Sequence, residues 1–196
     1  WDNLLTALAS DDQQRDLLLK SGMLVKNEAG RIYDRFRDRV VYPIRDQRGR
    51  VIAFGGRALS PDVPAKYLNS PETDLFSTSN VLYNYARARK NLPRNGNLVV
   101  VEGYMDVIAL AQAGIKNVVA SSGTALTVEQ IRLIKRFSKN VLIIFDADRA
   151  GIAAALRGID LMLENELAVQ VLLLPEGEDP DSYVKARGKS GFETFV

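Results

Sequence analysis

Two apolar runs, each followed directly by a carboxylate, constrain the fold of this chain more than any other feature. Residues 98–101 lead into Glu102, and residues 141–145 lead into Asp146. An unbroken β-branched run is typical of a strand that is buried on both faces, as in the parallel sheets of α/β proteins. Such proteins place their sites at the carboxyl ends of the strands. The pattern therefore predicts an α/β fold with an acidic site at one edge of its sheet.

The spacing of the acidic residues favours a shared ligand. Asp106 follows Glu102 by four residues, which places it on the same face in the first turn of a helix. Asp146 and Asp148 are two residues apart in what should be extended chain, so their side chains project from the same face. Their negative charges then repel each other unless a cation neutralises them. Helix capping is the structural alternative for Asp106 and Asp148, but it leaves Glu102 unexplained. We interpret the set as a hard-cation site for Mg²⁺ and phosphate chemistry.

Composition narrows the chemistry that this site can use. The 196 residues include no His and no Cys. Disulfides, a thiolate zinc site and the commonest general base are therefore excluded, and any catalytic metal must be held by oxygen ligands. No apolar stretch approaches the roughly 18 residues of a membrane span, and the N-terminus lacks a signal-peptide pattern. We expect no membrane partner.

The net charge of +2 is divided unevenly along the chain. Residues 1–100 carry 16 basic and 11 acidic residues, net +5, whereas residues 101–196 carry 10 and 13, net −3. Eight arginines lie between residues 31 and 57. A basic half beside an acidic half is typical of a polyanion track that leads to a metal site. A solvated arginine-rich face explains the same composition equally well.

The stretch 92–97 is the best candidate for a domain boundary. Before it, the apolar runs 40–44 and 51–54 flank a turn at Asp46–Arg50, which predicts a hairpin with Pro43 on an edge strand. We expect residues 1–96 to form a smaller mixed α+β part with a basic nucleic-acid-binding or nucleotide-binding face. Residues 60–78 are predicted to be mostly loop, and residues 79–90 to be helical.

Beyond the boundary, strands and helices alternate, which predicts a parallel sheet flanked by helices over residues 97–196. The expected strands are 98–102, 117–120, 141–145 and 168–174, and the expected helices end near residues 113, 137 and 166. Asp179 and Asp181 follow the last strand, and the sheet topology could bring them to the same edge as the other acids. Taken alone, that segment is a solvated turn in which Asp181 or Ser182 caps the next helix.

These motifs resemble the TOPRIM domain that primases and topoisomerases share. The matching segments are 102–106, 122–125, 146–151 and 179–181. Upstream segments narrow the resemblance to bacterial replicative primases of the DnaG type; these are residues 35–40, 43–46, 54–57 and 66–73. The match extends over essentially all 196 residues in the right order. We therefore expect a fragment of a primase catalytic core.

The resemblance implies that Glu102, Asp146 and Asp148 are the catalytic acids. Asp106, Asp179 and Asp181 would belong to the same metal-binding cluster, which holds two or more Mg²⁺ or Mn²⁺ ions on the triphosphate and the primer 3′-hydroxyl. The implied nucleotide-binding or nucleic-acid-binding residues are Arg35, Arg37, Arg57, Lys66 and Tyr67. Gly55-Gly56 would let the backbone approach a phosphate, or would form a bulge or turn. Thr78 stands where related primases often carry a lysine.

The resemblance implies a nucleotidyltransferase, a DNA-directed RNA polymerase that makes short RNA primers during replication in the bacterial cytoplasm. Its partners would be the single-stranded DNA template, NTPs and the RNA primer. The replicative helicase and the single-strand-binding protein would contact family regions outside this chain. The family's zinc domain would also lie outside it, so we expect no zinc in this fragment. We expect the fragment to be monomeric. The alternatives are a TOPRIM nuclease or topoisomerase, against which residues 31–73 argue, and a non-catalytic nucleic-acid-binding module.

Overall fold

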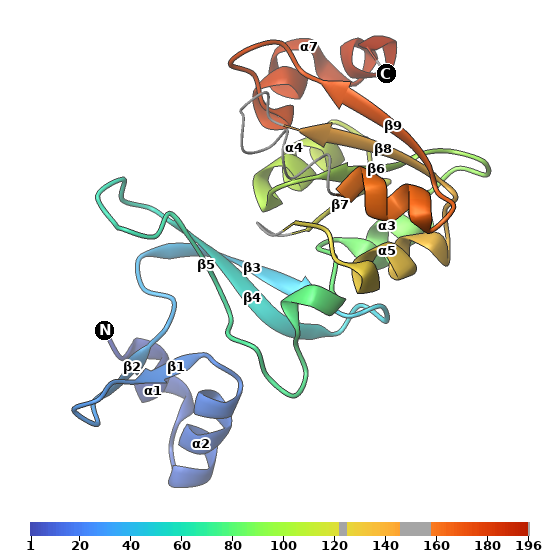
Figure 1. Cartoon of the computed structure of the whole chain (residues 1–196). Coiled ribbons are helices and arrows are strands. Elements are labelled where there is room, and N and C mark those ends of the chain that lie inside the picture. Colours follow the sequence, from blue (N-terminus) through green and yellow to red (C-terminus); the bar gives the residue numbers. More distant parts are fainter. Residues whose placement is uncertain (122–124, 146–157, 196) are drawn as a thin grey trace. The chain divides into compact units, whose positions relative to one another are not determined.

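The computed structural model describes residues 1–121, 125–145 and 158–195, which form two compact units (Figure 1). The first unit contains residues 1–44 and 50–77, and the second contains residues 45–49 and 78–196. No helix in the described part of the chain is long and apolar enough to cross a membrane.

The first unit combines two short helices with two antiparallel sheets. Its elements are α1 (Asn3–Leu8), α2 (Asp12–Lys20), β1 (Leu24–Lys26), β2 (Ile32–Asp34), β3 (Arg39–Arg45), β4 (Val51–Ala58) and β5 (Tyr67–Asn69). β1 pairs with β2, and the other sheet has the order β3-β4-β5. The predicted hairpin is therefore confirmed, with Pro43 on an edge strand. β5 lies within the stretch 60–78, which the sequence predicts to be mostly loop. The strand was not predicted because it depends on pairing with residues 55–57 of β4, and its polar sequence does not reveal that pairing.

A buried carboxylate fixes the start of the chain in this unit. Asp34, at the end of β2, accepts hydrogen bonds from the backbone amides of Leu4 (2.7 Å) and Leu5 (3.1 Å). These amides belong to the first turn of α1, whose donors have no partner within the helix. Asp34 therefore joins α1 to β2 and satisfies its own buried charge at the same time.

The second unit is built around a four-stranded parallel sheet in the order β7-β6-β8-β9. Its strands are β6 (Leu98–Val101), β7 (Val118–Ala120), β8 (Asn140–Phe145) and β9 (Ala168–Leu173). Its helices are η1 (Thr78–Asn80), α3 (Tyr85–Asn91), α4 (Tyr104–Gln112), α5 (Val128–Lys135) and α7 (Pro180–Phe195), together with helical residues 158–164. The α/β fold predicted from the alternating pattern is confirmed.

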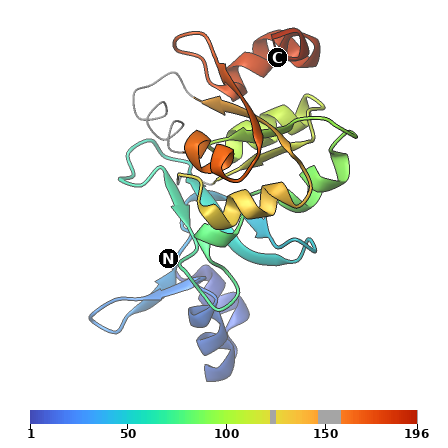
Figure 2. The ribbon, with the colours of Figure 1, turned by 45° about the vertical axis from the view of Figure 1, so that its right-hand side comes forward.

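Helices cover both faces of this sheet (Figures 1 and 2). Val99 and Val101 of β6 face a core cluster that includes residues of α4 and α7. Leu98 and Val100 face the opposite cluster, to which α3, α5 and residues 158–164 contribute. Since both faces are covered, every residue of β6 is buried. This explains why the strand is an uninterrupted apolar run.

The predicted helix 79–90 is wrong in its first half. Tyr83 instead forms an isolated β-bridge with Ala120, and Asn84 adopts a left-handed conformation (φ 66°) before α3 begins at Tyr85. The Asn84 side chain donates a hydrogen bond to the Val118 carbonyl at 2.9 Å. These contacts join residues more than thirty positions apart, so helix propensity alone could not reveal them.

Candidate functional site

The carboxyl ends of the parallel strands meet at one edge of the sheet. Val101 lies opposite Ala120, and the last residues of β8 and β9, Phe145 and Leu173, lie opposite each other. Val100 is paired with Ile143, so β6 and β8 end within about two residues of each other. Glu102, which follows β6 directly, therefore lies at the edge where sites of α/β proteins gather.

Asp106 is held beside this strand end. Its Oδ2 atom accepts a hydrogen bond at 3.0 Å from the backbone amide of Gly103, the residue after Glu102. Asp106 is at the third position of α4, so it satisfies a helix N-terminus while it adds negative charge to the edge. The Oε1 atom of Glu102 is itself buried. The structure thus places Glu102 directly after β6 and Asp106 in the first turn of α4, and their joint role in metal binding stays a prediction.

Asp179 has a structural role at the start of α7. Its Oδ1 accepts a hydrogen bond from the Ser182 amide (2.7 Å), and the Ser182 hydroxyl accepts one from the Asp179 amide (3.0 Å). This reciprocal arrangement caps the helix. The expected cap at Asp181 or Ser182 is therefore wrong, since the capping residue is Asp179.

Asp181 presents a carboxylate that is only half used. Its Oδ2 accepts a hydrogen bond from Lys185 Nζ at 2.7 Å. Its Oδ1 is buried and accepts no hydrogen bond from the part of the chain that the structure describes. A buried carboxylate oxygen is costly unless a donor or a cation satisfies it. Because the chain has no His or Cys, its metal ligands would be oxygen atoms such as this one, and oxygen ligands fit a hard cation.

Asp146 and Asp148, two of the three predicted catalytic acids, lie outside the described residues. β8 ends at Phe145, so it delivers the chain to the carboxyl edge immediately before Asp146. Within residues 1–121, 125–145 and 158–195, no three His, Cys, Asp or Glu side chains lie close enough together to hold a metal. The complete acidic cluster therefore stays a prediction.

In the first unit, three of the predicted binding residues lie together. Arg57 on β4 is paired with Tyr67 on β5, and directly opposite residues of an antiparallel pair project to the same face. Lys66 Nζ lies 5.9 Å from the centre of the Tyr67 ring. Lys66 and Tyr67 are exposed. Together, Arg57, Lys66 and Tyr67 make a basic surface with one aromatic ring.

Arg35 and Arg37 are engaged with the first unit itself. Arg35 donates two hydrogen bonds, from Nε (3.0 Å) and Nη2 (2.8 Å), to the Asn69 carbonyl, and burial lowers the pKa of its guanidinium. The Arg37 guanidinium lies 4.4 Å from the Trp1 ring centre and 4.5 Å from that of Tyr33. Both contacts are typical of arginines that hold a fold together. Nucleotide binding by these two residues stays a prediction.

Two supporting features of this surface were not recognised from the sequence. Arg39 donates hydrogen bonds to the carbonyls of Ala65 (2.7 Å), Lys66 (3.3 Å) and Gly56 (3.4 Å), and so holds the segment before β5. Gly56 is explained by packing, because a Cβ atom there would lie 2.7 Å from Phe36 Cδ1. Neither contact has a local sequence signal, since both join residues far apart in the chain.

Comparison with known proteins gives a consistent result for both units. Residues 1–89 match the family model described as DNA primase catalytic core, N-terminal domain, and residues 99–184 match the Toprim-like model. The chain is 49% identical over 196 residues to the DNA primase of Escherichia coli K12, and 52% identical over 200 residues to that of Pseudomonas aeruginosa PAO1. These alignments cover 98% and 100% of this chain. The chain belongs to the DnaG-type bacterial primases.

Solved primase structures share the fold of this chain. A DNA primase domain from Pseudomonas aeruginosa matches with a TM-score of 0.93 and 51% identity, covering 100% of this chain and 62% of that one. A DnaG primase catalytic domain bound to single-stranded DNA matches with a TM-score of 0.90 and 49% identity, covering 100% of this chain and 64% of that one. The chain spans about a third of the length of the curated primases, 34% of the Escherichia coli protein and 30% of the Pseudomonas aeruginosa protein.

The boundary between the primase parts stays a prediction at residues 96 and 97. The two family models end and begin at residues 89 and 99, on either side of it. The compact units, in contrast, separate between residues 77 and 78, with residues 45–49 joining the second unit. The family models and the compact units therefore divide the chain at different positions.

Proposed function

We propose that this chain carries the nucleotidyl-transfer centre of a DNA primase, which synthesises short RNA primers on single-stranded DNA from NTPs. The observation that carries the proposal is the position of Glu102 at the carboxyl edge of a Toprim-like parallel sheet, directly after buried β6. Relatives that are about half identical in sequence are named DNA primase, and one solved relative is bound to single-stranded DNA. The activity is proposed for the whole protein of which this chain forms part.

The acidic edge would hold Mg²⁺ or Mn²⁺ through carboxylate oxygens. The proposed ligands are Glu102, Asp106, Asp146, Asp148, Asp179 and Asp181. Bound metal would orient the primer hydroxyl and the triphosphate and neutralise developing charge. The buried Oδ1 of Asp181 and the strand-end position of Glu102 support their roles as ligands. Asp179 contributes chiefly by capping α7, which fixes the helix that carries Asp181.

The basic surface of the first unit would contact the phosphates. Arg57 and Lys66 supply positive charge, and the guanidinium fork of arginine matches phosphate oxygens. The exposed ring of Tyr67 would stack on a base or sugar. Arg35 would act mainly by holding β5 through the Asn69 carbonyl, and Arg37 would act mainly by packing against Trp1 and Tyr33. The replicative helicase and the single-strand-binding protein stay predicted partners of the whole protein.

Replacing Glu102 with Gln tests the metal centre. The substitution keeps the shape of the side chain and removes its charge, so we expect Mn²⁺ affinity in calorimetry to fall at least about tenfold. Primer synthesis from labelled NTPs on single-stranded DNA should fall by about a hundredfold or more, because the lost ligand acts on the reacting groups. Glu176→Gln is the matched control, since Glu176 is exposed in the turn after β9.

Circular dichroism and urea unfolding show whether a loss of Mn²⁺ binding comes from a loss of structure. Glu102→Gln should keep the circular dichroism spectrum of the wild-type chain. Its free energy of unfolding in urea should change by less than about 1.5 kcal/mol, because the replacement conserves the shape and volume of the side chain. If the variant bound Mn²⁺ as tightly as the wild type, the assignment of the acidic edge would be wrong. If the wild-type chain bound no Mn²⁺ at all, the metal-assisted mechanism would be rejected for this part of the protein.

A further inference from the structure

A second basic feature lies in the second unit, on the outer side of α3. A cavity of about 520 Å³ opens between the turn at residues 45–49 and α3. Five cationic residues line it, namely Arg45, Arg48, Arg87, Arg89 and Lys90. No Asp or Glu is among its lining residues in the described part of the chain. We call this cavity the α3 pocket.

The charges of the α3 pocket have no acidic partner among the residues that the structure describes. None of the five cations forms an ion pair within the residues that the structure describes. Four of them are exposed, and the fifth, Arg45, is half-buried and donates from Nη1 to the Gly49 carbonyl at 2.8 Å. Asp46 in the same turn accepts the Arg48 amide hydrogen bond and does not line the cavity. Cations gathered without counterions create a positive potential that attracts anions.

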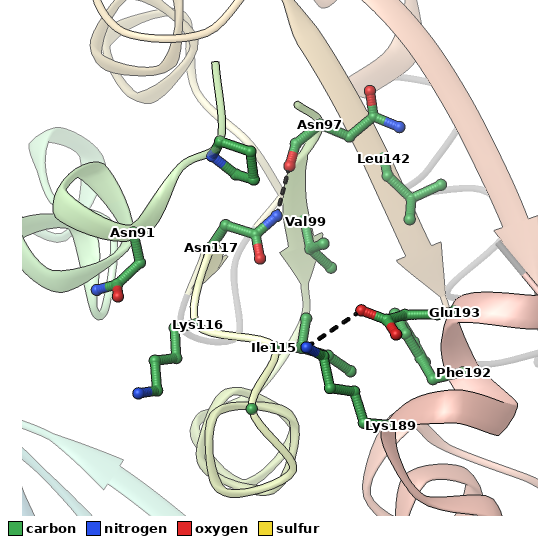
Figure 3. A pocket seen from close by; sticks show the side chains of 12 residues that line it. Asn91, Asn97, Val99, Ile115, Lys116, Asn117, Leu142, Lys189, Phe192 and Glu193 are labelled. Atoms are coloured by element: carbon green, nitrogen blue, oxygen red, sulfur yellow. Dashed lines mark hydrogen bonds and ion pairs between the residues drawn. The ribbon is translucent and has the colours of Figure 1, made fainter. Parts of the chain in front are cut away.

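Another cavity of the second unit shows the contrast (Figure 3). It has a volume of about 340 Å³ and is lined by asparagines, apolar side chains and charged residues. Its charges are partly balanced, since Lys189 Nζ lies 3.3 Å from Glu193 Oε1, and its asparagines are engaged, as in the 2.6 Å hydrogen bond from Asn117 to the Asn97 carbonyl. The lining of this cavity includes two lysines and one glutamate, so it carries a smaller excess of positive charge than the α3 pocket.

None of the described acids of the proposed metal centre lines the α3 pocket. The segment before α3 is bridged to Ala120 at the carboxyl end of β7, and the segment after it leads to Leu98 at the amino end of β6. α3 therefore runs against the strand direction, and its last turn, with Arg89 and Lys90, lies toward the amino edge. The pocket is thus distinct from the proposed metal centre.

We propose that the α3 pocket binds the phosphate backbone of single-stranded nucleic acid. This inference rests on the proposed function, because the polyanion would then be the template or primer strand. The lining includes no aromatic ring on which a base could stack, and its positive charges come from two separate elements. Such a site reads phosphates without reading sequence. It would hold a strand through residues that are not part of the proposed metal centre.

The test compares two double variants of the full chain. Arg89→Ala with Lys90→Ala removes two pocket charges, and Arg132→Ala with Lys139→Ala removes one exposed arginine and one exposed lysine elsewhere in the second unit. Binding of a fluorescent oligothymidylate is followed by anisotropy at several salt concentrations, with EDTA present so that no metal contributes. For the pocket variant, we expect affinity to fall about tenfold and the salt slope to shrink by about 1.4, since each phosphate contact to a single strand adds about 0.7.

Each outcome decides the proposal. If the pocket variant binds the oligonucleotide as the control variant does, the proposal is wrong. If it loses affinity for ATP, measured by calorimetry, but keeps affinity for the oligonucleotide, the pocket is a nucleotide site and the proposal is also wrong. Because the assay is free of metal, a loss confined to the pocket variant supports the pocket even if the chain fails to make primers, so failure of the proposed function remains distinguishable.

Discussion

The acidic residues at the carboxyl edge differ in how much each contributes to the fold. Asp106 accepts the Gly103 amide, and Asp179 caps α7 through Ser182. Asp181 gives one oxygen to Lys185 and keeps the other buried. A substitution at any of these positions therefore has a structural effect as well as an effect on metal binding. The two effects can be separated by choosing the replacement.

Asp106 offers the sharpest separation. Asn keeps an oxygen that can accept the Gly103 amide, so Asp106→Asn should destabilise the chain by about 0.5 kcal/mol, through the lost charge at the start of α4. Asp106→Ala also loses the hydrogen bond and should cost about 1 to 2 kcal/mol. Both variants should bind Mn²⁺ more weakly in calorimetry. Equal urea midpoints for the two would contradict the role of the Gly103 hydrogen bond in stability.

Single residues also show how far sequence reasoning reaches. Glu102 and Asp106 could be placed at a strand end and a helix start because the local pattern defines both elements. The engagement of Arg35 with the Asn69 carbonyl could not be predicted, since the two residues are 34 positions apart. Position in an element is a local property, whereas the partner of a long side chain depends on the tertiary fold.

The ends of elements were predictable where the signal was chemical and local. The capping box from Thr127 to Gln130 starts α5 as expected, and Gly114 follows α4 with a φ of +96°, a conformation that favours glycine. The start of α3 was not predictable, because the bridge between Tyr83 and Ala120 displaces it. β5 was missed for the same reason, since it exists through its partner strand.

Gln130 joins two elements through its side chain and should be sensitive to substitution. It is fully buried, its Nε2 donates to the carbonyls of Thr78 (3.0 Å) and Val81 (2.8 Å), and its Oε1 accepts from the Thr127 amide (3.1 Å). Gln130→Leu leaves these buried backbone groups without the side-chain partner, so we expect a loss of about 2 to 4 kcal/mol in urea unfolding. The exposed neighbour Glu129 provides the control, since Glu129→Gln should cost less than about 0.5 kcal/mol. Comparable losses at both positions would contradict this role for Gln130.

Over the whole molecule, apolar burial is concentrated in the second unit. Both core clusters lie on its parallel sheet. The first unit, which the structure describes completely, has four buried apolar side chains, namely Leu24, Ile44, Ala53 and Phe76. The alternation of strands and helices correctly predicted the parallel sheet on which these clusters lie, because each element has its own hydrophobic period in the sequence. The assignment of residues 45–49 to the second unit had no such signal, because it depends on contacts of the turn with distant parts of that unit.

This distribution predicts a wide range of local stability along the chain. Amide hydrogen exchange followed by mass spectrometry should show the slowest exchange in β6, β7 and β8, whose described side chains lie in or between the two core clusters. The two-stranded sheet of β1 and β2 has few buried side chains and should exchange at least about a hundredfold faster, after correction for intrinsic rates. Such a difference corresponds to opening of the small sheet without opening of the parallel one. If β1 and β2 exchanged as slowly as β6, the first unit would owe its stability to something other than its own apolar burial, and the argument from core size would fail.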